Sequence, residues 1–263
     1  MDLGLRVGSR IKLTRAATLD PAAALSRGSV PHTTLHDAEL EEPGFLSMDQ
    51  MGHPAHDMAC FTDGSGAVLV AGANGEIAHI QRNGLPALPR AFRHSSLHDL
   101  FPNDATTTSA SVSVPWTHLA PCPHVPGVFA AASADGSVHV FQRPKSEPTL
   151  SWEGVLPPSS SPAGLHWSAC RPGVLFLLDS AGVLRMWDLL RTTAEPAASV
   201  ALGNDAAGTW AIVDADATLI PRGLVATVGR RADIVSVHRL HSTWLRRRRG
   251  EVEAVKNILQ QER

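Results

Sequence analysis

The sequence has no tyrosine, few cysteines and no long apolar run. The small number of cysteines and the lack of a long apolar run each exclude a class of protein. Its three cysteines, Cys60, Cys122 and Cys170, cannot build a disulfide framework, and none belongs to a C-x-x-C pair that would indicate zinc or redox chemistry. No stretch reaches the roughly 18 apolar residues that a membrane-spanning helix needs. A formal net charge of -2 argues against a surface that embraces nucleic acid throughout. We therefore expect neither a membrane nor a nucleic acid as partner.

The residues that are abundant favour a globular β protein. Hydrophobic residues make up 43% of the chain, and 21 glycines and 19 prolines divide it into short elements separated by turns. Near the N-terminus, apolar residues stand mostly at alternate positions from Leu3 to Leu13, which is the period of a strand pair with one buried face. Residues 16–50 give only weak strand signals. We expect residues 1–50 to form a weakly structured segment with a strand pair at its start.

A repeat organises the rest of the chain. Residues 126–141 align without gaps on residues 172–187, and this alignment sets Gly136 opposite Gly182. Both segments consist of an apolar strand, a glycine turn and an alternating strand, which together predict a β-hairpin. A third copy precedes them around the turn Asn74–Gly75, a dipeptide that favours the tight turns of hairpins.

Further strands extend each hairpin into a larger unit. Upstream of the three hairpins lie strand candidates at residues 57–61, 116–120 and 164–168. The middle copy has a fourth strand at residues 149–152, and the proline-rich linker that follows at residues 157–162 is expected to form neither helix nor ladder. A weaker fourth copy covers residues 210–240. Four-stranded units that recur about every 40 to 45 residues are typical of propeller blades, so we predict an all-β propeller with about four recognisable blades.

The ends of these units resemble WD repeats. Residues 132–141 and 184–189 look like repeat ends, and Trp187–Asp188 is the dipeptide that gives the repeats their name. Residues 164–176, together with the closing residues 187–190, resemble the dynein intermediate chains, in which a W-S-P-x-R-P segment opens a blade. Within that family, the last blade and the tryptophan-plus-helix tail look most like the larger intermediate chains of the second cytoplasmic dynein, the motor of retrograde intraflagellar transport.

The resemblance implies a set of fold-signature residues. In strong WD repeats a buried aspartate in the turn bonds a histidine and a serine or threonine and fixes the blade to its neighbour. Asp135 and Ser133 fit this pattern, whereas Asn74 and Ala181 replace the aspartate in two other turns. We expect those two blades to rely on apolar packing instead. The signature residues are Asn74, Gly75, Ser133, Asp135, Gly136, Phe141, Gly182, Trp187 and Asp188.

The resemblance also implies a role without catalysis. An intermediate chain is a scaffold whose propeller docks the dynein heavy chain, in company with a second intermediate chain and light chains, in the cytoplasm, on the cytoskeleton and in the cilium or flagellum. Such a propeller has about seven blades, and a long N-terminal extension collects the light chains. Because only about four blades are recognisable, we expect the chain to be a shortened form or a C-terminal fragment; the alternative is that the missing blades have diverged beyond recognition.

No pattern in the sequence indicates a catalytic or cofactor site. Two histidine clusters have the spacing of metal ligands: His94, His98 and Asp99, and His53, His56 and Asp57. Each lacks further ligands, and both are better explained as polar loops. The sequence has neither the G-x-S-x-G elbow of a serine nucleophile nor a glycine motif for nucleotides. We expect no catalytic residue, no metal and no cofactor.

The C-terminal residues 239–263 are more basic than the rest, with seven Lys or Arg and three Glu. The run Arg246–Arg249 resembles a nuclear-localisation or polyanion patch, although such runs are more often plain solvated segments. Basic side chains at a helix N-terminus oppose the helix dipole. We therefore expect the helix to begin near Gly250, with Glu251 and Glu253 in its first turn.

An apolar stripe on this helix needs a surface to pack on. The stripe consists of Val252, Val255, Ile258 and Leu259. It can lie on the rim of the chain's own propeller or on a partner subunit, and both alternatives stay open, so these four residues are candidate partner-binding residues. The expected division of the chain is residues 1–50 as the N-terminal segment, 51–241 as blades and 242–263 as the basic segment and helix.

Three other functions are compatible with WD repeats. Substrate receptors of ubiquitin ligases typically carry an arginine two residues after the W-D dipeptide, but here Leu190 holds that position and Arg191 comes one residue late. A propeller enzyme needs acids or histidines gathered at the channel mouth, and the sequence indicates no such cluster. An axonemal dynein intermediate chain is the third alternative.

Overall fold

The computed structural model of the chain describes residues 55–81, 86–93, 114–202, 211–215, 222–228 and 235–261. Within these ranges the strands form four antiparallel sheets, which we number as blades 1 to 4 in chain order. A 3-10 helix, η2 (Ser242–Trp244), and an α-helix, α3 (Glu251–Gln261), follow the last sheet. No helix in the described ranges is long and apolar enough to cross a membrane. The predicted all-β class with a short C-terminal helix is confirmed.

Each blade is a meander in which every strand pairs with the next one along the chain. Blade 1 contains β1 (Ala55–Cys60), β2 (Ala67–Gly72), β3 (Glu76–Gln81) and β4 (Pro86–Arg93), and blade 2 contains β5 (Trp116–Pro121), β6 (Val128–Ser133), β7 (Val138–Gln142) and β8 (Pro148–Trp152). Blade 3 contains β9 (Pro162–Trp167), β10 (Val174–Asp179), β11 (Val183–Asp188) and β12 (Ala198–Ala201). Blade 4 contains β13 (Ala211–Ala215), β14 (Arg222–Val228) and β15 (Val235–Arg239).

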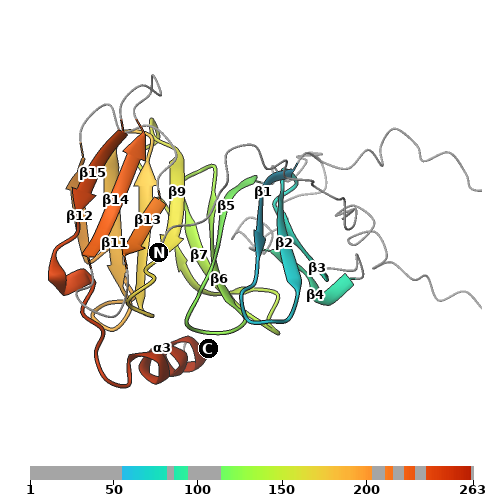
Figure 1. Ribbon diagram of the computed structural model, residues 1–263. Helices are drawn as coiled ribbons and strands as arrows, with labels where there is room; N and C mark the ends of the chain where they lie inside the picture. The colour runs from blue at the N-terminus through green and yellow to red at the C-terminus, as the bar shows by residue number, and fades with distance from the viewer. Residues whose placement is uncertain are drawn as a thin grey trace, which may run out of the picture.

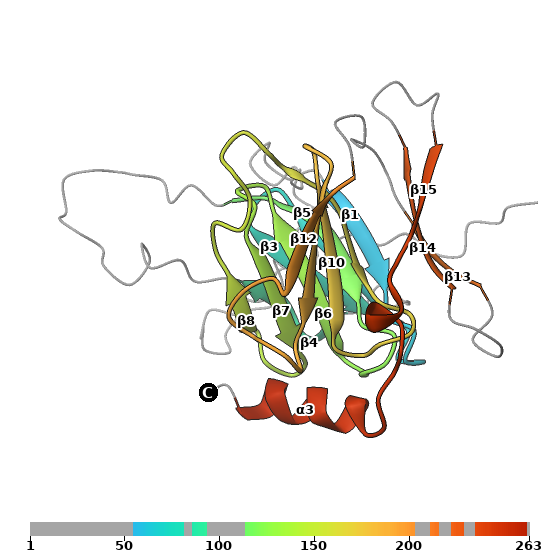
Figure 2. The same cartoon turned by 90° about the vertical axis from the view of Figure 1, so that its left-hand side faces the viewer.

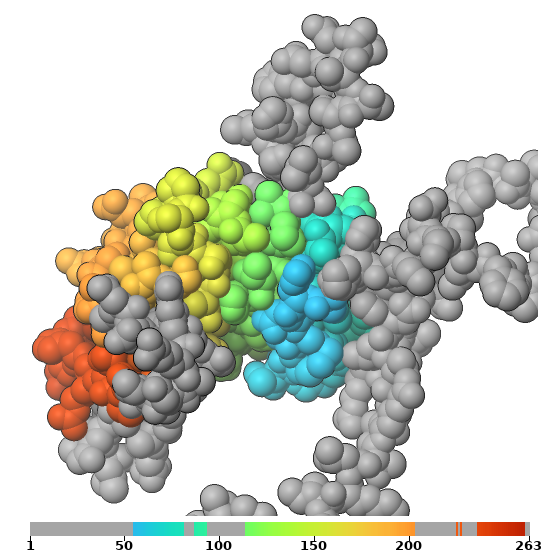
Figure 3. Space-filling view, turned by 90° about the horizontal axis from the view of Figure 1, so that it is seen from above, coloured from blue at the N-terminus to red at the C-terminus, as the bar shows by residue number. Residues whose placement is uncertain are grey.

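The hydrophobic core lies between the blades. Figure 1 shows the sheets standing side by side, and in the view from above in Figure 3 the orange-red residues by the last sheet lie at the opposite end from blade 1. β6 is buried at all six positions because blade 2 has a neighbour on each face. Its residues alternate between the two interfaces: Val128 and Ala130 pack with blade 3, whereas Phe129 and Ala131 pack with blade 1. A strand that is covered on both faces in this way is largely apolar instead of alternating between apolar and polar residues.

A side-chain oxygen supports the turn between the second and third strands in blades 1, 2 and 3. In blade 2, Asp135 Oδ1 accepts a hydrogen bond from the amide of Ser137 at 2.9 Å and another from the Ser133 hydroxyl. Burial favours the neutral form of Asp135, but these hydrogen bonds outweigh it and hold the pKa of the carboxyl below its ordinary value. In blade 1, Asn74 Oδ1 accepts from the amide of Glu76 at 3.2 Å.

Blade 3 supports its turn from a different position in the sequence. Asp179 takes the place of Ser133, and its Oδ1 accepts hydrogen bonds from the amides of Ala181 at 3.0 Å and Val183 at 2.8 Å. Its other carboxylate oxygen pairs with Arg185. The expectation that this blade relies on apolar packing alone is therefore wrong at this turn. The aspartate has moved two residues toward the N-terminus, and it supports the amide that follows the turn glycine as Asp135 does.

Indole N–H groups connect neighbouring blades. Trp116 of blade 2 donates to the carbonyl of Gly75 in blade 1 at 2.8 Å. Trp167 of blade 3 donates to the carbonyl of Ala120 in blade 2 at 2.9 Å. These two tryptophans occupy the first strands of their blades, so the same device is used at consecutive interfaces. A buried hydrogen bond of this kind contributes about 1 kcal/mol and fixes the angle at which the blades meet.

The structure contains two strands that the sequence did not indicate, β4 and β12. β4 includes Pro86 and Pro89, which an outer strand tolerates because one of its edges needs no N–H donors. The linker predicted at residues 157–162 is wrong at its last residue, because β9 begins at Pro162, which pairs with Asp179 after a bulge.

The three predicted hairpins are confirmed as β2–β3, β6–β7 and β10–β11. Other predictions lie outside the described residues: the N-terminal strand pair within residues 1–50, His53, the cluster of His94, His98 and Asp99, and the turn at residues 230–232.

Candidate functional site

Helix α3 lies across one end of blades 2 and 3, as Figures 1 and 2 show from two directions. Val255 and Leu259 are fully buried in the core cluster that these two blades share, and Val252 packs against the same cluster. Ile258 is half-buried. The sequence left two surfaces open for the apolar stripe, the rim of the chain's own blades and a partner subunit. The contacts observed among the described residues are with the chain's own blades.

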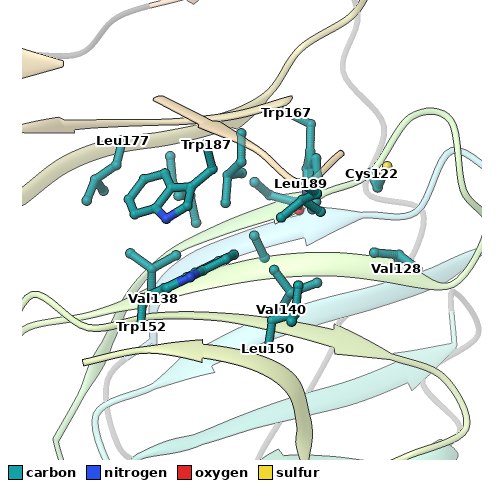
Figure 4. Close-up of a cluster of buried hydrophobic side chains, with 14 of the residues drawn as sticks. Cys122, Val128, Val138, Val140, Leu150, Trp152, Trp167, Leu177, Trp187 and Leu189 are labelled. Atoms are coloured by element: carbon teal, nitrogen blue, oxygen red, sulfur yellow. Dashed lines mark hydrogen bonds between the residues drawn. The ribbon is translucent and has the colours of Figure 1, made fainter. Parts of the chain in front are cut away.

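The cluster beneath the helix is built around two tryptophans. Trp187 of β11 and Trp152 of β8 have ring centroids 5.2 Å apart, and Figure 4 shows them facing each other between blades 3 and 2. The Trp152 indole N–H donates to the carbonyl of Thr193 at 2.6 Å. The Trp187 indole nitrogen is buried and has no hydrogen-bond partner in the described part of the chain. Trp187 therefore acts through its apolar surface.

A glycine allows α3 to approach blade 3 closely. Gly173 lies in the loop before β10, and a Cβ atom added there would stand 3.0 Å from Cγ2 of Val255 and 3.5 Å from Cγ of Leu190. Such a contact is tighter than most side chains accept, so a larger residue here would require Val255 to shift. The glycine that the sequence repeat places at residue 173 thus has a packing role at the helix contact.

A buried ion cluster fixes the start of the helix to blade 3. Arg171 donates to Glu251 Oε1 from Nε at 2.8 Å and from Nη2 at 2.6 Å. Its Nη1 donates to Asp188 Oδ2 at 3.0 Å and to the carbonyl of Thr243 at 3.0 Å. The Arg171 and Glu251 side chains are 1% and 0% exposed. Burial opposes the charge of Arg171, but the hydrogen bonds to Glu251 and Asp188 outweigh it and raise the pKa of the guanidinium.

Local hydrogen bonds hold each partner of this cluster in place. The Ser168 hydroxyl accepts from the amide of Arg171 at 3.1 Å, which orders the loop between β9 and β10. Oε2 of Glu251, the oxygen that Arg171 does not use, accepts from the amide of Arg248 at 2.9 Å. Glu251 thus supports the first turn of α3, where a negative charge is favourable, and neutralises Arg171 at the same time.

The fold-signature residues do not converge on one site. They are spread over three blades: Asn74 and Gly75 lie in the β2–β3 turn, Ser133 at the end of β6, Asp135 and Gly136 in the β6–β7 turn, Phe141 on β7, Gly182 in the β10–β11 turn, and Trp187 and Asp188 at the end of β11. Gly136 and Gly182 have φ values of 85° and 78°. Asp188 alone belongs to the ion cluster.

Sequence patterns do not indicate that Arg171, Gly173 and Glu251 act together. In the sequence, Arg171 is a single charged residue between two apolar strands. A charged side chain at such a position needs an oppositely charged partner if it is to be buried. Its partners are 17 and 80 positions away, so local patterns do not identify them.

A metal site requires several ligating side chains that lie close together. No group of three or more His, Cys, Asp or Glu side chains in these ranges is placed to hold a metal ion. Asp57, which the sequence grouped with His53 and His56, accepts a hydrogen bond from the amide of Leu119 at 2.7 Å and so joins blade 1 to blade 2.

Comparisons with known proteins agree with this architecture. No family model matches the chain. The chain is 24% identical over 261 residues to cytoplasmic dynein 2 intermediate chain 1 of Homo sapiens and 25% identical over 244 residues to its Mus musculus namesake, and these alignments cover 99% and 92% of the chain. They cover only 22% and 21% of those relatives. The solved structure of Saccharomyces cerevisiae Sqt1 superposes on this chain with a TM-score of 0.53 and is 15% identical in sequence. The match covers 73% of this chain and 48% of the Sqt1 chain. The resemblance to dynein intermediate chains and the WD-repeat propeller fold are confirmed.

Proposed function

We propose that the chain is a non-catalytic scaffold subunit of a dynein motor complex and that its blades dock the dynein heavy chain for retrograde intraflagellar transport in cilia and flagella. The observation that carries this proposal is the similarity to cytoplasmic dynein 2 intermediate chain 1 along 99% of the chain. A second intermediate chain and light chains are the further partners. The protein acts in the cytoplasm, on the cytoskeleton and in the cilium.

The connections between blades suit a docking platform. Trp116 and Trp167 join consecutive blades through buried hydrogen bonds, and Arg143 pairs with Asp63 across blades 2 and 1 while its guanidinium lies 4.3 Å from the ring centroid of Phe61. A surface that is ordered before a partner arrives loses little conformational entropy on binding. The rigid array therefore supports a role in holding another chain.

The buried charges also support a structural role. Arg171 pairs with both Asp188 and Glu251, and Asp179 pairs with Arg185. Each of these groups is engaged in fixing a turn or a helix. None is left as a free acid or base facing a cavity in the described ranges, which favours a scaffold over an enzyme.

Affinity purification from ciliated cells tests the proposal. The tagged full chain is expected to enrich a dynein heavy chain, identified by mass spectrometry. A Leu177→Asp variant, which places a charge in the interface of blades 2 and 3, serves as a misfolded control and is expected to lose the heavy chain. The proposal would be contradicted if a cullin adaptor or an axonemal heavy chain were recovered in place of the expected motor. It would also be contradicted if the Leu177→Asp control recovered as much heavy chain as the wild type.

A further inference from the structure

Four consecutive arginines, Arg246–Arg249, form an exposed turn between η2 and α3, which we name the arginine turn. None of the four guanidinium groups has a carboxylate partner among the residues that the structure describes. The nearest acidic residues in the sequence are engaged elsewhere, because Glu251 pairs with Arg171 and Glu253 pairs with Lys256 at 2.8 Å. Within the described residues, the turn therefore presents four positive charges that have no carboxylate partner.

The backbone of the arginine turn is fixed at both ends. Before the turn, Leu245 is 5% exposed, and the amide of Arg246 donates to the carbonyl of Ser242 at 2.9 Å. Within the turn, the amide of Arg248 donates to Glu251, which is itself held in the buried ion cluster. The turn closes at Gly250, whose φ of 75° few other residues adopt. The four side chains thus project from a preorganised backbone.

This arrangement is unfavourable for the protein alone. Four like charges repel one another, and they stand directly before the N-terminus of α3, where the helix dipole favours negative charge. Sequences depart from such local rules mainly at functional sites. A bound polyanion would relieve both the mutual repulsion and the opposition to the dipole. We propose that the arginine turn binds an acidic segment of a partner protein, whose carboxylates pair with the guanidinium groups.

The chemistry of the turn favours an acidic peptide over other polyanions. The planar fork of arginine matches a carboxylate or a phosphate through two parallel hydrogen bonds, so the surroundings of the turn decide between these polyanions. Single-stranded nucleic acids need exposed aromatic rings for stacking, but the nearby Trp244 packs against the core cluster of blades 3 and 4. The turn also lacks the apolar face with which helices insert into membrane surfaces. This inference does not rest on docking of the heavy chain.

Fluorescence anisotropy with a labelled polyglutamate peptide tests the proposal on the full chain. We expect the peptide to bind, a polyglutamine peptide not to bind, and the affinity to fall as salt screens the charges. The double variant Arg246→Gln/Arg247→Gln is expected to weaken binding by roughly threefold to thirtyfold. The matched variant Lys145→Gln/Arg191→Gln removes two exposed charges elsewhere and is expected to leave the affinity unchanged.

Three outcomes would overturn the proposal. The first is no saturable binding of polyglutamate by the wild-type chain, and the second is an equal loss of affinity in both double variants. The third is tighter binding of a single-stranded oligonucleotide, or of vesicles containing phosphatidylserine, that is lost in Arg246→Gln/Arg247→Gln. All four substituted side chains are exposed, so each variant is expected to fold. Thermal unfolding of each variant checks this expectation.

Discussion

Arg171 and Glu251 are 80 positions apart in the sequence, yet two hydrogen bonds of 2.8 Å and 2.6 Å join them in the interior of the protein. Because Arg171 also bonds Asp188 at the end of β11, a single guanidinium connects blade 3 to the helix that covers blades 2 and 3. The C-terminal helix is thus fastened by charge as well as by apolar contact.

Replacement of Arg171 by Met is expected to destabilise the protein by about 3 to 5 kcal/mol, because it leaves two buried carboxylates without a counter-charge. Urea unfolding followed by tryptophan fluorescence measures this loss. The triple variant Arg171→Met/Asp188→Asn/Glu251→Gln removes the unpaired charges and is expected to recover part of the stability. An unchanged midpoint in Arg171→Met would show that the cluster does not stabilise the fold.

Replacement of Gly173 by Val is expected to push α3 away from blade 3 and to cost about 1 to 3 kcal/mol, because the new side chain overlaps Val255. Hydrogen exchange of the amides of α3 measures the displacement. The second-site variant Gly173→Val/Val255→Ala restores space and is expected to recover protection of the helix. If the single variant exchanges as slowly as the wild type, the close contact is not required.

Two tryptophans allow the hydrogen bond between blades to be measured. Trp167 and Trp187 are both buried, but within the described ranges only Trp167 has a partner for its indole N–H, the carbonyl of Ala120. Trp167→Phe and Trp187→Phe remove the same ring atoms, so the difference between their losses in stability isolates the hydrogen bond. We expect Trp167→Phe to cost about 1 to 3 kcal/mol more in urea unfolding. Equal costs would mean that the bond contributes nothing.

The hairpins could be predicted because their signals are local. Asn74–Gly75 and Asp135–Gly136 place turn residues between apolar strands, and the pattern survives even where the acid has moved to Asp179. The strands β4 and β12 could not be predicted in this way. Outer strands bury little surface, so they need neither alternating apolar residues nor a full set of N–H donors.

The contact between the helix and the blades shows the limit of sequence reasoning. The start of α3 at Glu251 follows from the dipole rule and the glycine before it, and the stripe containing Val255 follows from helical periodicity. The surface that the stripe covers depends on Gly173 and Arg171, which lie 80 positions or so earlier in the chain. No local pattern connects them, so both alternatives for the stripe were equally consistent with the sequence.

Buried histidines make the stability of the blades depend on pH. His79 is 1% exposed, contacts the rings of Phe61 and Phe92, and has one ring nitrogen 2.8 Å from the carbonyl of Pro89. Its other ring nitrogen has no partner in the described ranges. Burial disfavours the charged imidazolium and holds the pKa of His79 below its ordinary value of 6.5. Burial lowers the pKa of His118 as well.

A histidine whose pKa is lowered by folding takes up its proton more readily in the unfolded state. The stability that depends on the neutral ring is therefore complete above pH 6.5, and it is lost as the pH falls from 6.5 toward the lower pKa of the folded state. Thermal unfolding at about pH 7.5 and about pH 5.5 measures this loss. The variant His79→Gln cannot titrate at this position, and its stability is expected to fall less than that of the wild type over the same range. An identical fall in both proteins would assign the pH dependence to other groups, and the variant His118→Gln tests the second histidine whose pKa is lowered.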